Sequence, residues 1–256
     1  MNELKVSVIQ FDIFWENPEK NRNYLDDTLK NGSADLFILP EMWSTGFSMQ
    51  PDKCGSQDEA LTWMQKKAQE KSAAICGSLI MLNEADQYVN RLFFVYPDGQ
   101  YEYYDKRHLF TMGDEPNHYS PGKSRLIVEY KGWRICPLIC YDLRFPVFAR
   151  NNAAYDLLIY VANWPAKRAE HWKALVKARA IENQSYLLAC NRVGVDANGV
   201  DHVGDSVVYD YKGESLATSG SLPEVLNATL ILEELKEGRE KFPVLADRDP
   251  FTADWA

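Results

Sequence analysis

Runs of consecutive apolar residues, each about as long as one β-strand, recur along this 256-residue chain and constrain its fold more than any other feature. Two such runs are Asp35–Pro40 and Trp133–Ile139, and a further strand rich in β-branched residues is predicted over Lys5–Phe11. The longest predicted helix is Lys167–Gln184. Strands that are apolar at consecutive positions are buried on both faces. The alternation of strands and helices therefore predicts an α/β fold with two stacked sheets, and the absence of a linker predicts one domain over residues 1–256.

Composition narrows the class of protein. The chain is 46% hydrophobic and carries a formal net charge of −9, which disfavours nucleic acid and anionic membrane surfaces as partners. No apolar run approaches the length of a membrane span, and the first strand pattern begins without the basic region of a signal peptide. The five cysteines have no repeated spacing and no C-x-x-C pair. These features together predict a reduced, cytoplasmic protein.

Three residues with reactive side chains each follow a predicted strand directly: Glu41, Lys106 and Cys140. Each alone has a structural interpretation, as a helix-start carboxylate, a solvated charge or a small core residue. The carboxyl ends of parallel strands meet at one edge of a sheet, however, so we expect the three side chains to cluster. At such a strand-to-helix junction, unpaired backbone N–H groups favour a thiolate, and we expect them to lower the pKa of Cys140.

The sequence around these residues carries longer motifs. They are Pro40-Glu41-Met42-Trp43, Tyr104-Asp105-Lys106-Arg107-His108-Leu109, Cys140-Tyr141-Asp142-Leu143-Arg144-Phe145-Pro146, Asn163-Trp164-Pro165, and His171-Trp172 followed by Ala178-Arg179-Ala180-Ile181-Glu182-Asn183-Gln184. In this order they resemble the signature of the nitrilase superfamily of carbon–nitrogen hydrolases over almost the whole chain. The resemblance implies a four-layer αββα sandwich that forms homodimers. The segments Pro146–Asn152 and Lys167–Gln184 would then form the dimer contact, with Trp172 in the interface or in the core.

The resemblance also implies a Glu–Lys–Cys triad and no cofactor. Cys140 would be the nucleophile, Glu41 its general base, and Lys106 the stabiliser of the tetrahedral intermediate. The backbone N–H of Tyr141 would complete the oxyanion hole. These roles agree with the chemistry of amide hydrolysis, because a thiol needs a base and an oxyanion needs a fixed positive charge. Members of the superfamily often have a second glutamate after the lysine, and Glu115 occupies that place beside Asp114.

The substrate-binding residues are less well defined by the motifs. In related carbamoylases an arginine at the position of Arg144 binds the substrate carboxylate, which suits the planar guanidinium. Alternatively, Arg144 pairs with Asp142 or another acid and braces the turn. The aromatic residues Phe47, Trp43 and Trp164 are candidates for the pocket wall.

Among the branches of the superfamily, Pro40–Met49 and the compact Met112–Pro116 loop most resemble bacterial omega-amidases. Their substrates are omega-amides of 2-oxo dicarboxylic acids, namely 2-oxoglutaramate and 2-oxosuccinamate. The alternatives are an N-carbamoyl-amide hydrolase, a deaminated-glutathione amidase, a nitrilase, or a binding protein that keeps the fold without catalysis. In every catalytic case the partner is a small-molecule amide or nitrile.

Other kinds of site have little support in the sequence. The four histidines are scattered and show no metal-ligand spacing, so no metal is expected. A Cys–His mechanism through His108 stays open as an alternative to the triad. Neither a G-x-x-x-x-G-K-[ST] loop nor a G-x-G-x-x-G fingerprint occurs, which leaves nucleotide binding without support.

Overall fold

The apolar runs form two six-stranded sheets in the computed structural model, which describes residues 3–252. The first sheet has the strand order β14-β1-β2-β3-β4-β5 and consists of β1 (Glu3–Gln10), β2 (Leu36–Ile38), β3 (Ala74–Leu82), β4 (Tyr88–Val95), β5 (Tyr101–Asp105) and β14 (Glu224–Ile231). The second has the order β13-β12-β9-β8-β7-β6 and consists of β6 (Val128–Tyr130), β7 (Trp133–Ile139), β8 (Leu157–Ala162), β9 (Tyr186–Asn191), β12 (Val207–Tyr209) and β13 (Ser215–Thr218).

The two sheets share one pairing pattern. The three strands β1, β2 and β3 are parallel, as are β7, β8 and β9, and the strands outside each trio pair antiparallel. Parallel neighbours need crossover connections, which in these sheets run through helices, whereas antiparallel neighbours can be joined by short turns. The second half of the chain therefore repeats the arrangement of the first, as the order of elements predicted.

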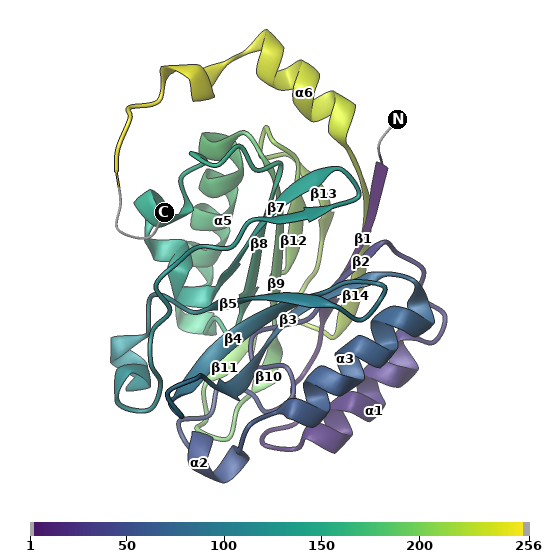
Figure 1. Cartoon of the computed structure of the whole chain (residues 1–256), viewed down its shortest axis with the longest axis vertical. Coiled ribbons are helices and arrows are strands. Elements are labelled where there is room, and N and C mark those ends of the chain that lie inside the picture. Colours follow the sequence, from purple (N-terminus) through teal and green to yellow (C-terminus); the bar gives the residue numbers. More distant parts are fainter. Residues whose placement is uncertain (1–2, 253–256) are drawn as a thin grey trace.

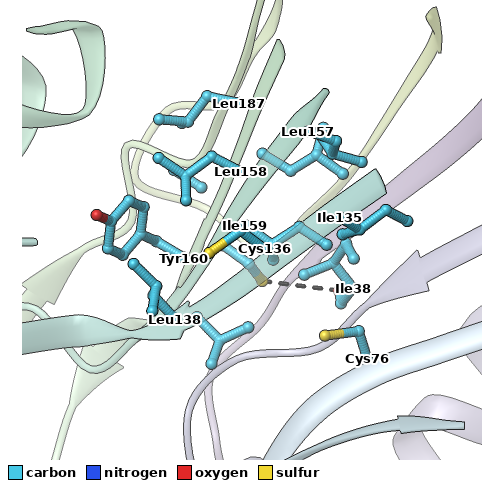
Figure 2. Packing of buried hydrophobic residues seen from close by; sticks show 14 of the residues in the cluster. Ile38, Cys76, Ile135, Cys136, Leu138, Leu157, Leu158, Ile159, Tyr160 and Leu187 are labelled. Atoms are coloured by element: carbon cyan, nitrogen blue, oxygen red, sulfur yellow. Dashed lines mark hydrogen bonds between the residues drawn. The ribbon is translucent and has the colours of Figure 1, made fainter. Parts of the chain in front are cut away.

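The sheets stack face to face and enclose the larger apolar core. Figure 2 shows part of it, with Ile38 and Cys76 of the first sheet near Ile135 of the second. The Cys190 thiol of β9 reaches the Ile38 carbonyl oxygen at 3.7 Å, so the two layers are in direct contact. Burial on the inner faces by the facing sheet and on the outer faces by helices explains why the central strands are apolar at consecutive positions.

Helices cover both outer faces, which completes the αββα sandwich that the sequence predicted. Helices α1 (Pro18–Leu29) and α3 (Asp58–Lys71) lie side by side over the first sheet, and α5 (Ala169–Asn183) covers the second (Figure 1). Trp172 of α5 is 1% exposed and donates its indole N–H to the Asp205 carbonyl oxygen at 2.8 Å, so it belongs to the core.

The remaining elements are short or peripheral. They are α2 (Pro51–Cys54), α4 (Pro146–Ala149), α6 (Leu232–Lys241), the hairpin β10 (Val193–Val195) and β11 (Asp201–Val203), and the 3-10 turns η1 (Thr111–Gly113), η2 (Glu115–Asn117), η3 (Cys140–Arg144), η4 (Ala166–Arg168) and η5 (Val244–Asp247). No helix within residues 3–252 is both long enough and apolar enough to cross a bilayer.

Candidate active site

The carboxylate of Glu41 is completely buried where the chain leaves β2. Its Oε1 accepts hydrogen bonds from Asn90 Nδ2 at 2.8 Å and from Lys106 Nζ at 2.9 Å, and its Oε2 accepts the backbone N–H of Asn163 at 2.8 Å. The Asn163 side chain also donates to the Glu41 carbonyl oxygen at 2.5 Å. This carboxylate is thus fixed in one orientation by donors from strand β4 and from the segments that follow β5 and β8.

Lys106 lies between two carboxylates, although burial opposes its charge. Its ammonium contacts Glu41 Oε1 at 2.9 Å and the two Glu115 oxygens at 2.9 and 3.0 Å. Glu115 belongs to the 3-10 turn η2 and also accepts the backbone N–H of Phe110 at 2.5 Å. Burial alone would lower the pKa of Lys106, but Glu115 and Glu41 raise it above its ordinary value, so the ammonium is permanently charged. Burial, together with the negative charge of Glu41, raises the pKa of Glu115 despite the contact with Lys106.

The thiol of Cys140 is at the end of β7, where the chain turns sharply. Cys140 has a φ of +43°, a left-handed conformation that is strained for a residue with a Cβ, and it opens the turn η3. Burial raises the pKa of the thiol well above its ordinary value, and the charge of Glu41 raises it further, while Lys106 opposes both. Cys140 is therefore a neutral thiol at rest, and the expectation of a lowered pKa is wrong. One short turn of unpaired N–H groups does not outweigh burial beside a carboxylate.

Asp142, two residues after the thiol, connects this turn to the segment that carries Lys106. Its buried carboxylate accepts the backbone N–H of Ile139 at 3.0 Å and the hydroxyl of Tyr104 at 2.8 Å. It also accepts the backbone N–H of His108 at 3.2 Å and lies 2.7 Å from His108 Nδ1. The His108 ring is stacked on Phe145, with 3.7 Å between ring centroids. Through these contacts His108 helps to hold the turn that follows Cys140. His108 does not line the cavity over Cys140.

A cavity of about 220 Å³ opens over Cys140 and Lys106. Of the residues expected from the sequence, Phe47, Tyr141, Arg144 and Trp164 line it. Such a volume lies below the roughly 300–1,000 Å³ typical of pockets for drug-sized ligands, which indicates a small substrate.

Trp43 does not line this cavity, so the prediction that it forms a pocket wall is wrong. Its side chain is 0% exposed and packs against Trp63 with 5.0 Å between ring centroids, in the core between the first sheet and its helices. The motif places Trp43 only two residues after Glu41, but Met42 has a φ of +45° and the chain turns sharply there. Adjacent side chains therefore have different surroundings.

Arg144 lines the cavity and is not paired with Asp142. Its Nη2 donates to His171 Nδ1 at 3.1 Å, and its guanidinium carbon lies 4.8 Å from the centroid of the Trp164 ring. Within residues 3–252 no carboxylate forms an ion pair with it, so the bracing interpretation through Asp142 has no support. Its guanidinium is available to a ligand in the cavity.

The sequence interpretation missed the hairpin β10–β11, which contributes Asp196, Asn198, Val200 and His202 to the cavity wall. The signal was present, because the dipeptide Asn198-Gly199 between two short apolar segments is typical of a tight hairpin turn. Other residues of the wall were also missed or left without a role, among them Lys167 and Arg168, just before α5, and Asn163, which fixes Glu41.

The fold and the site define a class of protein. An αββα sandwich brings an ammonium, two carboxylates and a thiol together at the strand ends under a small cavity, an arrangement suited to hydrolysis of carbon–nitrogen bonds through a cysteine.

Comparison with known proteins identifies the family. Residues 5–240 match the family model described as carbon-nitrogen hydrolase, and this chain belongs to that family. It is 46% identical over 254 residues to the omega-amidase YafV of Escherichia coli (strain K12), with 98% of this chain and 99% of the relative covered. It is 34% identical to the 2-oxoglutaramate amidase of Bacillus subtilis (strain 168), with 94% and 96% covered.

A solved structure supports the same assignment. The crystal structure of a CN-hydrolase superfamily protein from Xanthomonas campestris, which holds an arsenic adduct in its active site, superposes with a TM-score of 0.96 at 42% identity. The match covers 99% of this chain and 100% of that one. Both the nitrilase-superfamily resemblance and the αββα fold predicted from the motifs are thus confirmed.

Proposed function

We propose that this protein is an omega-amidase, a hydrolase that converts the omega-amide of a 2-oxo dicarboxylic acid, such as 2-oxoglutaramate or 2-oxosuccinamate, to the 2-oxo acid and ammonia. The observation that carries the proposal is the Lys106 ammonium held between Glu41 and Glu115 beside the Cys140 thiol, in a cavity whose wall includes an arginine without a carboxylate partner within the described residues. The names of the E. coli and B. subtilis relatives agree with it. Residues 1–256 act as one catalytic domain.

In the first half of the reaction, the Cys140 sulfur attacks the amide carbon while Glu41 takes the thiol proton. The thiol is neutral at rest, so attack and proton transfer are coupled. Negative charge develops on the carbonyl oxygen of the tetrahedral intermediate, where Lys106 and the backbone N–H of Tyr141 stabilise it. The intermediate collapses as Glu41 returns the proton to the nitrogen, which leaves as ammonia. A thioester remains on Cys140.

In the second half, water attacks the thioester carbon and gives a proton to Glu41. A second tetrahedral intermediate forms at the same oxyanion site. Its collapse breaks the carbon–sulfur bond, releases the carboxylic acid and restores the thiol with the proton held by Glu41. The three hydrogen bonds that Glu41 accepts keep the carboxylate in place through both halves.

Glu115 and the wall residues have supporting roles in this proposal. Glu115 fixes the Lys106 ammonium through two contacts at 2.9 and 3.0 Å. Arg144 binds the substrate carboxylate, and Phe47 and Trp164 shape the pocket around the carbon chain. The Lys106 ammonium lies 4.9 Å from the centroid of the Phe47 ring, so this wall residue is in direct contact with the catalytic group.

We further infer that the protein works in the cytoplasm as a homodimer. The five cysteines are free thiols, which suits a reducing compartment. Val147 of α4 and Ile181 of α5 are 54% and 46% exposed, and apolar side chains at these positions suit a contact between subunits. Sedimentation velocity tests the dimer: a single monomeric species at micromolar concentration contradicts it.

Ammonia release across a panel of substrates tests the function. We expect release from 2-oxoglutaramate and much slower turnover of glutamine, an N-carbamoyl amino acid and a simple nitrile. Cys140→Ala abolishes the release, whereas the matched control Cys54→Ala, at a cysteine outside the cavity, retains it. A preference for the carbamoyl compound or the nitrile assigns another nitrilase-type reaction. No turnover of any substrate by the native chain favours a binding protein.

A further inference from the structure

A second arginine, Arg168, lines the same cavity as Arg144. It ends the 3-10 turn η4 directly before α5, and its carbonyl oxygen accepts the indole N–H of Trp164 at 2.8 Å, which fixes the turn to the cavity wall. Its guanidinium carbon lies 5.1 Å from the centroid of the Phe110 ring. Each of the two arginines therefore lies over an aromatic ring of the wall, Arg168 over Phe110 and Arg144 over Trp164.

Neither guanidinium has an anionic partner in the part of the chain that the structure describes. One carboxylate lines the cavity with them, that of Asp196, but its Oδ1 already accepts the backbone N–H groups of Asn198 and Val200 at 2.8 and 2.9 Å. Those bonds hold Asp196 in the turn of the β10–β11 hairpin. Arg144 and Arg168 are thus left uncompensated in the wall, where the exposed Lys167 of the same turn is a further cation, in a chain whose net charge is −9.

The two cations act on each other. Burial and then the positive charge of Arg144 lower the pKa of Arg168, which means that the protein environment disfavours its charge. An anion bound between the guanidinium groups would offset this repulsion. It would also accept hydrogen bonds from N–H groups that burial has separated from water. Guanidinium groups bind carboxylates through paired N–H donors, and partial exclusion of water strengthens such bonds.

We propose that Arg168, together with Arg144, forms a two-arginine site for the carboxylate at the end of the substrate remote from the amide, and that Arg168 thereby determines specificity for acid monoamides over uncharged amides. The identity of the amide rests on the proposed omega-amidase function. Arg168 is a binding residue in this scheme and takes no part in the transfer of protons at Cys140.

Two substrates separate recognition of the carboxylate from the chemistry. 2-Oxoglutaramate carries the carboxylate, and 4-oxopentanamide has a methyl group in its place on the same chain. For Arg168→Gln we expect the ratio of kcat/KM between them to fall about 10- to 100-fold, mainly through KM, because a charge-assisted hydrogen bond to the carboxylate is lost. Arg168→Lys keeps the charge without the planar fork, and we expect an intermediate ratio.

Lys177→Gln is the matched control, since it removes the same charge from an exposed side chain of α5, the helix that follows this turn, and does not line the cavity. We expect its ratio to stay within about fivefold of the native value, as for an exposed charge. If the ratio of kcat/KM falls equally in the two variants, the proposal is overturned, because the general positive charge of this face would then explain the effect. An unchanged ratio in Arg168→Gln, with both substrates slowed alike, overturns it as well, because Arg168 would then act on the fold or the chemistry.

Binding provides a readout that does not depend on turnover. Calorimetric titration of the Cys140→Ala chain with 2-oxoglutarate should give binding that Arg168→Gln weakens by a similar factor. No binding to Cys140→Ala, or equal binding with and without Arg168, contradicts the two-arginine site. Failure of the native chain to release ammonia from 2-oxoglutaramate refutes the proposed function instead, and leaves this titration as the test of the anion site.

Discussion

Replacing Glu41 with glutamine should separate two properties of Cys140 that the native site combines: hydrolysis of an amide and reactivity toward an alkylating reagent. The Glu41 carboxylate accepts hydrogen bonds from three nitrogen donors, namely Lys106, Asn90 and the backbone N–H of Asn163, and it also interacts with the Cys140 thiol. A glutamine amide has one acceptor oxygen, so its NH₂ group must face at least one of these donors. We expect this conflict to cost about 1–3 kcal/mol of unfolding free energy.

Amide hydrolysis should suffer far more than stability. Without Glu41, no group remains to take the thiol proton, deliver it to the leaving ammonia and activate water. General acid–base catalysis contributes about 100- to 10,000-fold, so we expect kcat for 2-oxoglutaramate to fall by such a factor. This corresponds to roughly 3–5 kcal/mol of activation free energy.

Alkylation of Cys140 should respond in the opposite direction. After burial, the charge of Glu41 is the main cause that raises the pKa of Cys140, and Lys106 opposes it. Removing the carboxylate leaves the ammonium in place, so we expect the thiol of Glu41→Gln to ionise at lower pH than in the native chain. Iodoacetamide needs the thiolate and no proton donor, so its reaction with Cys140 should persist and begin at lower pH.

The assay is the rate of modification at Cys140, followed by mass spectrometry of the peptide from about pH 6 to about pH 10. Cys54 is an internal control, because it lies outside the cavity and should react alike in both proteins. If alkylation of Cys140 slows in Glu41→Gln at every pH, in step with kcat, the electrostatic reasoning is refuted.

Two further predictions concern stability. The Asp142 carboxylate only accepts hydrogen bonds, and its donors are Ile139, Tyr104 and His108, so the NH₂ group of Asp142→Asn must face at least one donor. We expect the unfolding free energy to fall by about 1–3 kcal/mol for each donor left unpaired. An unchanged midpoint of urea unfolding contradicts this prediction. Burial, and then the charge of Arg192, lowers the pKa of His202 from 6.5 to about 4, so the unfolded chain binds more protons between these values. Stability from His202 is therefore complete above pH 6.5, and roughly 3 kcal/mol is lost as the pH falls to 4. We expect His202→Gln not to lose this stability as the pH falls. If the urea midpoints of the native chain and of His202→Gln decrease equally over this pH range, the prediction is refuted.

The sequence predicted most of the secondary structure because the signals are local. The pair Asn17-Pro18 predicts an N-cap followed by the first residue of a helix, and α1 begins there, with the Asn17 side chain accepting the backbone N–H of Lys20 at 3.0 Å. The strand β7 has the bounds that its apolar run predicts, Trp133–Ile139. A side chain that caps its own helix, or a strand that is apolar throughout, depends on residues a few positions apart.

Where the sequence-based prediction is wrong, surroundings remote in sequence are decisive. The position of Trp43 in a motif suggests the pocket wall, but its side chain packs against Trp63 of α3. The lowered pKa expected for Cys140 follows from local N–H groups, whereas burial and Glu41 raise it. Neither effect has a local signal, since both depend on which elements the fold brings together.

The sequence by itself determined which reactive side chains follow the strands, because strand ends and their residues are properties of short segments. Apolar runs are enough to put Glu41 and Cys140 after strands, and the Pro97-Asp98-Gly99 turn before Gln100–Tyr104 does the same for Lys106. Only the tertiary structure decided how they act on one another. The Lys106 ammonium contacts Glu41, which lies 65 positions away in the chain, and the core between the two sheets removes the Cys140 thiol from most of its contact with water. Burial and charge–charge interaction depend on the packing of the whole sandwich, and they determine the protonation state of the Cys140 thiol.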